Sequence, residues 1–357
     1  MPEHEEQHFY GGQAVLEGVM MRGTDRYGIA VRRTDGEVVT TAEPLQGLAV
    51  KEGWHKWPLI RGNYMLVESM ALGMKALQFS ADVLTAEESE KAAAETAASA
   101  PLPAGEAATV AVAVAEAHRE EQQSAGTPLA RIWIYLSTAF AFVLGIGLFI
   151  VLPTAIPGWI YGPATHGVNA DSIKRNLVEG GIRLLVIVAY ILAISLMKYV
   201  KRVFQYHGAE HSTINCYEGG LAVTVQNCLG FSPLHPRCGT AFLLVVIVVK
   251  ILVGCFFGWP VAWLRITLRL ASLPLVAGIA YEVLRWAGRH RSSVLARIMA
   301  YPGLALQKLT TRRPDAEQVQ VAIYALAAVA PEIPLPADFP TPRRVDLRLQ
   351  PVEQEVA

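Results

Sequence analysis

The residues best suited to chemistry are His207, Glu210 and His211, which form the pattern H-x-x-E-H. On a helix, positions i, i+3 and i+4 share one face, so the three side chains would point the same way. Two such imidazoles can bind one divalent ion, and the carboxylate beside them can act as general base toward a water molecule. The pattern is that of inverted zincins, and it predicts a zinc-type site. The alternative is a polar interfacial helix whose histidines only form hydrogen bonds.

A third protein ligand must come from another position. Glu218 lies seven residues after His211, on the same face of a helix that we expect to end at Gly219–Gly220. Glu282 lies in a later apolar segment, where an ionisable side chain is a functional candidate. By analogy with inverted zincins, whose third ligand comes from a distant helix, we prefer Glu282. His235 or Cys238 is the other option, although the segment that holds them could equally be a turn before an apolar segment.

Three more charged residues are candidates for lining the site. Lys250 interrupts an apolar segment and could neutralise Glu282 or hold an anionic substrate. We favour a structural role without function, in which its long side chain extends toward a cavity within the helix bundle. Glu17 and Arg22 lie in a glycine-rich stretch near the N-terminus. They could bind a substrate or dock against the His207 helix, and a cluster of backbone turns is as good an explanation.

Four apolar segments are long enough to be candidate membrane spans. They are Ile132–Leu152, Ile182–Val200, Ala241–Gly258 and Leu268–Leu284. The last is the weakest, because it contains Arg269, Pro274 and Glu282. Lysine and arginine follow the second and fourth segments, which predicts four spans with both termini and the His207 motif on the cytoplasmic side.

The composition supports a membrane protein of a reducing compartment. The 357-residue chain is 52% hydrophobic and only 17% charged, below the usual share of about 25%. Lys plus Arg and Asp plus Glu both number 31, so there is no basic surplus and we expect no nucleic-acid partner. The four cysteines form no CxxC pair and indicate no disulfide framework. The acidic N-terminus predicts no cleavable signal peptide.

We expect a mainly α, polytopic helical membrane protein of about four spans with a small N-terminal α+β unit. The α+β unit should contain a hairpin of residues 28–33 and 37–42 around Asp35–Gly36, followed by a helix over 63–84. Helices over 292–309 and 315–329 should follow the last span. The predicted parts are an N-terminal unit (8–84), an Ala/Glu-rich linker (85–128), a membrane domain (129–290), cytoplasmic helices (291–330) and a disordered tail (331–357).

Several long stretches of the chain resemble the YqhQ-like family of bacterial membrane proteins, a domain of unknown function. They are Gly11–Gly23, Phe204–His211, His235–Thr240 and Pro274–Glu282, with the region around Pro302–Leu304. The resemblance implies a multi-pass protein of the bacterial cytoplasmic membrane and a predicted metal-dependent enzyme, but no established reaction. The Ala/Glu-rich linker resembles an insertion relative to shorter relatives.

The leading hypothesis is a metal-dependent hydrolase at the cytoplasmic membrane face, acting on a membrane peptide or a lipid-linked group. A non-catalytic scaffold that binds a partner protein is the alternative. A transporter that uses Lys250 and Glu282 as intramembrane charges is a weaker one, because four spans are few and no internal repeat is present. Dimerisation would supply further spans, and the sequence leaves the oligomeric state open.

Overall fold

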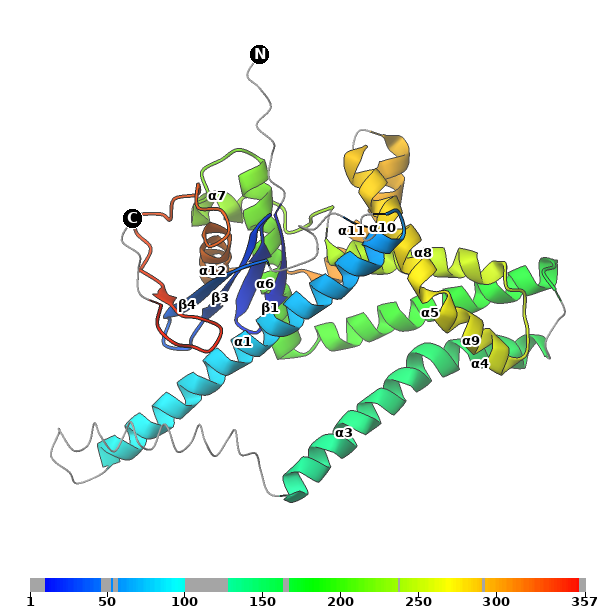
Figure 1. Cartoon of the computed structure of the whole chain (residues 1–357), viewed down its shortest axis with the longest axis horizontal. Coiled ribbons are helices and arrows are strands. Elements are labelled where there is room, and N and C mark those ends of the chain that lie inside the picture. The colour runs from blue at the N-terminus through cyan, green and yellow to red at the C-terminus, as the bar shows by residue number, and fades with distance from the viewer. Residues whose placement is uncertain are drawn as a thin grey trace, which may run out of the picture.

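The computed structural model describes residues 10–45, 53, 57–99, 128–162, 167–236, 238–290 and 293–352. These residues form a small mixed sheet packed between helices, beside a larger apolar helical part (Figure 1). The mainly helical character and the small N-terminal sheet agree with the sequence prediction.

The sheet has five strands in sequential order. They are β1 (Gly11–Val15), β2 (Gly18–Arg22), β3 (Arg26–Arg32), β4 (Val38–Pro44) and β5 (Arg343–Arg344). The first four are antiparallel, and β5 runs parallel to β4. The predicted hairpin is confirmed as β3–β4, and its turn contains Gly36 at φ +92°, a conformation that glycine adopts readily. The glycine-rich stretch before it forms a further hairpin, β1–β2, which the sequence analysis did not predict.

The helices in the first half of the chain are α1 (Ile60–Ser99), α3 (Pro128–Ile146), the π-helix η3 (Gly147–Val151), α4 (Leu152–Tyr161), α5 (Ala170–Ser195) and α6 (Lys198–Glu218). Those in the second half are α7 (Val225–Leu229), α8 (Gly239–Cys255), α9 (Ala262–Ala271), α10 (Leu273–Arg289), α11 (Val294–Thr310) and α12 (Ala316–Ala327). The last two correspond to the predicted C-terminal helices, and Asp315 caps α12 as its position suggested.

Both faces of the sheet are covered by helices. Successive side chains of a strand point to opposite faces, so Met20 packs with Phe79 of α1 while Met21 packs in the cluster that contains residues of α6 and α12. Gly28 of β3 allows close approach of α12, because a Cβ there would lie 2.7 Å from the Cβ of Ala328. The folded unit around the sheet therefore combines segments from both ends of the chain and from its middle.

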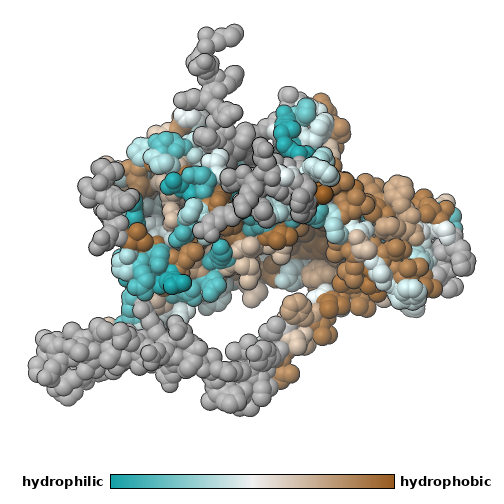
Figure 2. Space-filling model, in the orientation of Figure 1, coloured by the Kyte–Doolittle hydropathy of each residue, from teal (hydrophilic) through white to brown (hydrophobic). Residues whose placement is uncertain are grey.

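Two helices are long and apolar enough to cross a membrane, Ala139–Tyr161 and Ala170–Ser195. The pair α9–α10 is bent by 45° and would make a third if it acts as one span. Helix α8 is apolar but shorter. The surface of this helical part is largely hydrophobic, in contrast to the sheet region (Figure 2). The predicted second span thus begins earlier, at Ala170, and the predicted fourth is not one straight helix.

Two predicted disordered or linking regions are partly structured. Helix α1 continues through residues 85–99 of the predicted linker, with Glu87 and Ala93 buried, while residues 100–127 lie outside the described part. The tail was predicted to be disordered from Pro331 onward. Within it, Arg343 and Arg344 instead form β5 beside β4, and Val345 is buried. A short extended segment can hydrogen-bond to the otherwise unpaired edge of a sheet, even where prolines lie nearby.

Candidate metal centre

The His207 motif lies on α6, as the sequence predicted. Helix α6 is separate from α5, because Met197 between them has an extended backbone with ψ 132°. It ends at Glu218 with Gly219 as its C-cap, and Gly220 follows at φ +72°. The helix packs against β1, β2 and α12, so the motif faces the interior of the folded unit.

Gly208, inside the motif, allows α6 to approach another segment of backbone. A Cβ at this position would overlap the carbonyl oxygen of Arg312. The amide of Arg312 donates in turn to the carbonyl of Phe204, at 2.9 Å. The small residue between the histidine and the glutamate is therefore a packing requirement that fixes α6 against the start of the α11–α12 connection.

Three side chains converge at this place. The ligand atoms of His207, His211 and Cys238 all lie within 4.8 Å of one another, and Nε2 of His207 is 3.1 Å from Sγ of Cys238. The two imidazole centroids are 4.4 Å apart. Tetrahedral ligation at about 2.0–2.3 Å places ligand atoms roughly 3.5 Å apart. The set of donors, two imidazoles and one thiol, therefore suits zinc in its chemistry, and the donors lie close enough together to reach one ion.

Backbone carbonyls orient both imidazoles. Nδ1 of His207 lies 2.8 Å from the carbonyl oxygen of Thr310, and Nδ1 of His211 lies 2.7 Å from that of Pro233. A carbonyl can only accept, so each Nδ1 carries the proton and each Nε2 keeps its lone pair. Burial lowers the pKa of His211, and the charge of His207 acts in the same direction, whereas the hydrogen bond to Cys238 and that to the Pro233 carbonyl act against them. The lowered pKa favours the neutral form of His211, which is the form that ligates a metal.

Cys238 reaches the cluster from the start of α8. It is the N-cap residue of that helix, and its Sγ accepts from the amide of Thr240 at 3.4 Å. The hydroxyl of Thr240 lies 3.2 Å from the same sulfur. These contacts fix the thiol beside His207 on a rigid helix end, a position that suits a ligand sulfur.

Glu210 lies next to the cluster in a buried position. It is 4% exposed, and the amide of Gly12 hydrogen-bonds to its carboxylate, while Oε2 has no hydrogen-bond partner among the described residues. A Cβ at Gly12 would lie 3.0 Å from Cδ of Glu210, so this glycine makes room for the carboxylate. Burial raises the pKa of Glu210 even though His207 and His235 favour its charged form. A raised pKa suits a general base near neutral pH.

His235 and Glu218 contact each other beside the cluster. Nε2 of His235 is 3.6 Å from Oε2 of Glu218, and its ring centroid is 5.7 Å from that of His211. The segment of His235 is held by Gln307 of α11, which accepts from the His235 amide at 2.9 Å and donates to its carbonyl at 2.8 Å. Gln307 is fully buried. Sequence reasoning missed this residue, and a polar side chain in an apolar helix was the signal that could have found it.

Glu282, the preferred third ligand from the sequence, is not brought to the cluster. Its carboxylate pairs with Arg61 of α1, with Nε of the arginine 2.6 Å from Oε1. The side chain that lies beside the two histidines is instead Cys238 at the start of α8, which the sequence offered as an alternative to Glu282.

The other predicted lining residues also have partners elsewhere. Glu17 docks onto α6, where it accepts from Arg202 and from the hydroxyl of Tyr206, the latter at 3.1 Å. Arg22 pairs with Glu68 of α1 at 2.5 Å. These two residues hold the sheet to its covering helices.

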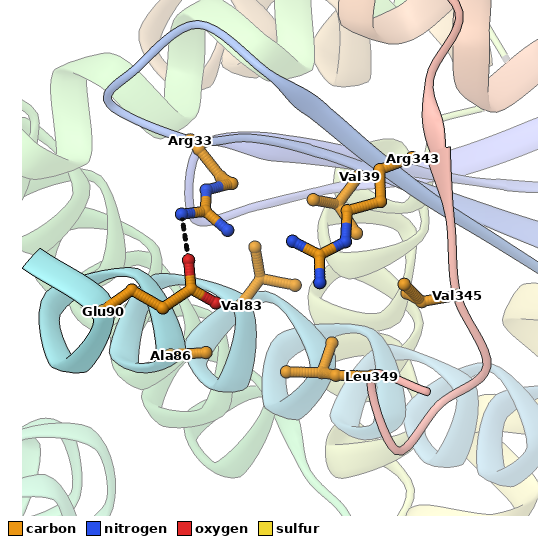
Figure 3. A pocket seen from close by; sticks show the side chains of 8 residues that line it. All are labelled: Arg33, Val39, Val83, Ala86, Glu90, Arg343, Val345 and Leu349. Atoms are coloured by element: carbon orange, nitrogen blue, oxygen red, sulfur yellow. Dashed lines mark hydrogen bonds and ion pairs between the residues drawn. The ribbon is translucent and has the colours of Figure 1, made fainter. Parts of the chain in front are cut away.

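A small pocket between α1 and the edge of the sheet is separate from the cluster. Its lining includes Arg33, Glu90, Arg343 and Val345, and Figure 3 shows Arg33 hydrogen-bonded to Glu90 across it. Since it shares no residue with His207, His211 or Cys238, the pocket does not alter the assignment of the site.

Comparison with known proteins identifies the family. A family model described as "Protein of unknown function (DUF1385)" matches residues 57–332. The chain is 35% identical over 323 residues to a protein of Bacillus subtilis (strain 168) named "Uncharacterized protein YqhQ", with 90% of this chain and 92% of that protein covered. No solved structure matches. The chain therefore belongs to the DUF1385 family, in agreement with the YqhQ-like resemblance of its motifs.

Proposed function

We propose that this protein is a metal-dependent hydrolase of the bacterial cytoplasmic membrane, with its site on the cytoplasmic side. The observation that carries the proposal is the convergence of His207, His211 and Cys238, with both imidazoles held by carbonyls so that Nε2 is available as a ligand. Three protein ligands leave a fourth position for water or substrate, as in catalytic zinc sites.

The chemistry follows from the donors and from Glu210. A divalent ion held by the three side chains would act as a Lewis acid on a substrate carbonyl or phosphoryl oxygen. Glu210 lies beside the ligands with one carboxylate oxygen unpartnered among the described residues. It would remove a proton from the attacking water and return it to the leaving group. Burial of the site excludes bulk water and strengthens these charge interactions.

The membrane assignment rests on the apolar helices and on connectivity. Helices α6 and α12 both pack on the sheet that β1–β4 form. The chain must therefore return to the side of the sheet after α3–α5, and again after α8–α10. Each of these excursions therefore crosses the bilayer an even number of times or not at all. We propose that each is a hairpin of two crossings, which gives four spans, with α8 and α10 as the shorter pair.

Metal content of the purified full-length protein tests the proposal. We expect about one zinc ion per chain in the wild type and a near-complete loss in a His207→Ala/His211→Ala double variant. His290→Ala is the matched control, because His290 is exposed and stacks on Trp286. Equal metal content in the wild type and the double variant would refute the site.

A Glu210→Gln variant separates a hydrolase from a scaffold. It should keep its metal, because Glu210 is outside the group of ligand atoms. It should lose at least about 100-fold of the hydrolysis rate with an activated ester as probe, the usual contribution of a general base. Unchanged hydrolysis in a metal-replete variant would favour the scaffold function.

A further inference from the structure

A second group of charged side chains lies within the apolar helical part. This basic cluster consists of Arg175, Arg183, Lys250, Arg265, Arg269 and the carboxylate of Glu179. Arg175, Glu179 and Arg183 recur every fourth residue along one face of α5, and Arg265 and Arg269 have the same spacing on α9. Helices α4 and α9 lie at the end of the helical part remote from the sheet, so this cluster is distinct from the metal centre (Figure 1).

The carboxylate at the centre of the basic cluster is already engaged. Oε1 of Glu179 accepts from Arg183 at 2.8 Å, from Arg269, and from the hydroxyl of Thr154 at 3.2 Å. Glu179 is 1% exposed. Asp171 pairs with Arg175 at 2.8 Å near the start of α5. Oε2 of Glu179 has no hydrogen-bond partner among the described residues, so the charge of this one carboxylate is shared by all the remaining cations.

Two cations are left uncompensated. Arg265 is 7% exposed, its guanidinium lies 3.9 Å from the ring centroid of the buried Trp259, and its Nε has no hydrogen-bond partner among the described residues. Lys250 interacts with Arg183, Arg269 and Glu179 through charge alone, with no hydrogen bond to the described residues. Among the described residues, Arg183, Lys250, Arg265 and Arg269 share the single carboxylate of Glu179, so four positive charges face one negative charge, an excess of three.

Such an excess is unfavourable in an apolar environment. Arg175 and Arg265 both lie beside Trp259, and Arg175 follows Ala170 by five residues, so this part of the cluster is roughly 8 Å along that candidate span, near the level of lipid head groups. A buried cation without a partner costs several kcal/mol, and ionisable residues at this depth usually pair or bind a ligand. An anion bound at Arg265 would supply missing negative charge to the cluster, and the planar guanidinium suits a phosphate oxygen pair.

We propose that the basic cluster binds the phosphate group of an anionic phospholipid. The helices around it carry exposed apolar side chains, among them Leu185, Trp263 and Leu270, which would contact acyl chains. Basic pockets between membrane helices are known binding places for anionic head groups. The indole of Trp259, beside Arg265, fixes the guanidinium for this contact.

Thermal unfolding of the full-length protein in neutral detergent tests this, with phosphatidylglycerol, phosphatidylcholine or inorganic phosphate added. Phosphatidylglycerol should raise the melting temperature at concentrations about tenfold lower than phosphatidylcholine, and inorganic phosphate should have little effect. A Lys250→Gln/Arg265→Gln double variant should lose this preference. Lys174→Gln is the control, because Lys174 is an exposed cation of α5 outside the cluster, and this variant should keep the preference.

Three results would overturn the proposal. They are equal stabilisation of the wild type by the two lipids, a preference that persists in the double variant, and equal stabilisation by inorganic phosphate, which would assign the cluster to a soluble anion. If the double variant does not fold, Arg265→Lys replaces it, since it keeps the charge and removes the planar fork. It should require about tenfold more phosphatidylglycerol than the wild type, and an unchanged requirement would also overturn the proposal.

Discussion

At the scale of single residues, the motif identified two of the three converging donors and the neighbouring acid. The spacing of His207, Glu210 and His211 was sufficient, because a helix alone places them on one face. Cys238 was one of several options for the third donor, and the choice among them depends on how α8 approaches α6, which no local pattern encodes. The carbonyls of Thr310 and Pro233 that orient the rings are invisible in a sequence for the same reason.

Gly208 provides a test of the packing that holds the motif. Gly208→Ala should destabilise the protein by about 3 kcal/mol, because the added methyl group overlaps the Arg312 carbonyl and α6 must shift. Thermal unfolding of the metal-free protein would measure this. Gly181→Ala is the control, since Gly181 is also helical and a Cβ there has nothing within 4 Å. Equal stability of the two variants would contradict the close contact.

At the scale of elements, hairpin β3–β4, helix α6 and the two C-terminal helices follow from alternation, capping and glycine positions. The extension of α1 through residue 99 was missed because the Ala/Glu-rich composition resembles a linker. Its burial arises from tertiary contacts, in which Glu87 accepts hydrogen bonds from the amide and hydroxyl of Thr34. Composition alone cannot distinguish such a helix from a solvated one.

The Glu87 contact predicts a pH-dependent stability. Burial would raise the pKa of Glu87, but the hydrogen bonds from Lys91 and Thr34 outweigh it and lower the pKa to about 2. The contribution is therefore complete above the ordinary value of 4.5 and is lost as the pH falls toward 2. Lys91 is half exposed, so solvent screening limits the contribution to on the order of 1 kcal/mol.

Denaturant unfolding at about pH 6 and about pH 3 would measure this contribution, because these two values lie on either side of the ordinary carboxyl pKa. Glu87→Gln should be less stable than the wild type at pH 6, and the difference should shrink toward pH 3. Glu88→Gln serves as control, since Glu88 is exposed on the same helix. A difference between Glu87→Gln and the wild type that does not change with pH would contradict the charged contact.

At the scale of the whole molecule, the sheet unit is assembled from segments that are distant in sequence. Residues before the first apolar helix supply β1–β4, the middle of the chain supplies α6, and the C-terminal part supplies α12 and β5. The hydroxyl of Tyr10 donates to Glu332 at 2.8 Å, which joins the two ends directly. The sequence predicted separate N-terminal and C-terminal units. Hydrophobic periodicity indicates where helices and strands occur, but it does not indicate which of them pack together.

This assembly predicts that both ends of the folded chain lie on one side of the membrane. In a Cys255→Ser background, a membrane-impermeant maleimide added to intact cells should label Val168→Cys, between α4 and α5. It should label Arg344→Cys on β5 only after permeabilisation. Both positions are exposed in the folded chain, so a difference in labelling reports the side of the membrane and not burial. Labelling of Arg344→Cys in intact cells would contradict the cytoplasmic placement of the sheet.

The central claim is that His207, His211 and Cys238 jointly bind one metal ion, and X-ray absorption at the zinc edge tests it most directly. The wild-type protein should show nitrogen ligands at about 2.0–2.1 Å together with one sulfur at about 2.3 Å. The sulfur contribution should disappear in Cys238→Ser. A bound zinc with no sulfur in the wild type, or a spectrum unchanged by Cys238→Ser, would contradict the assignment.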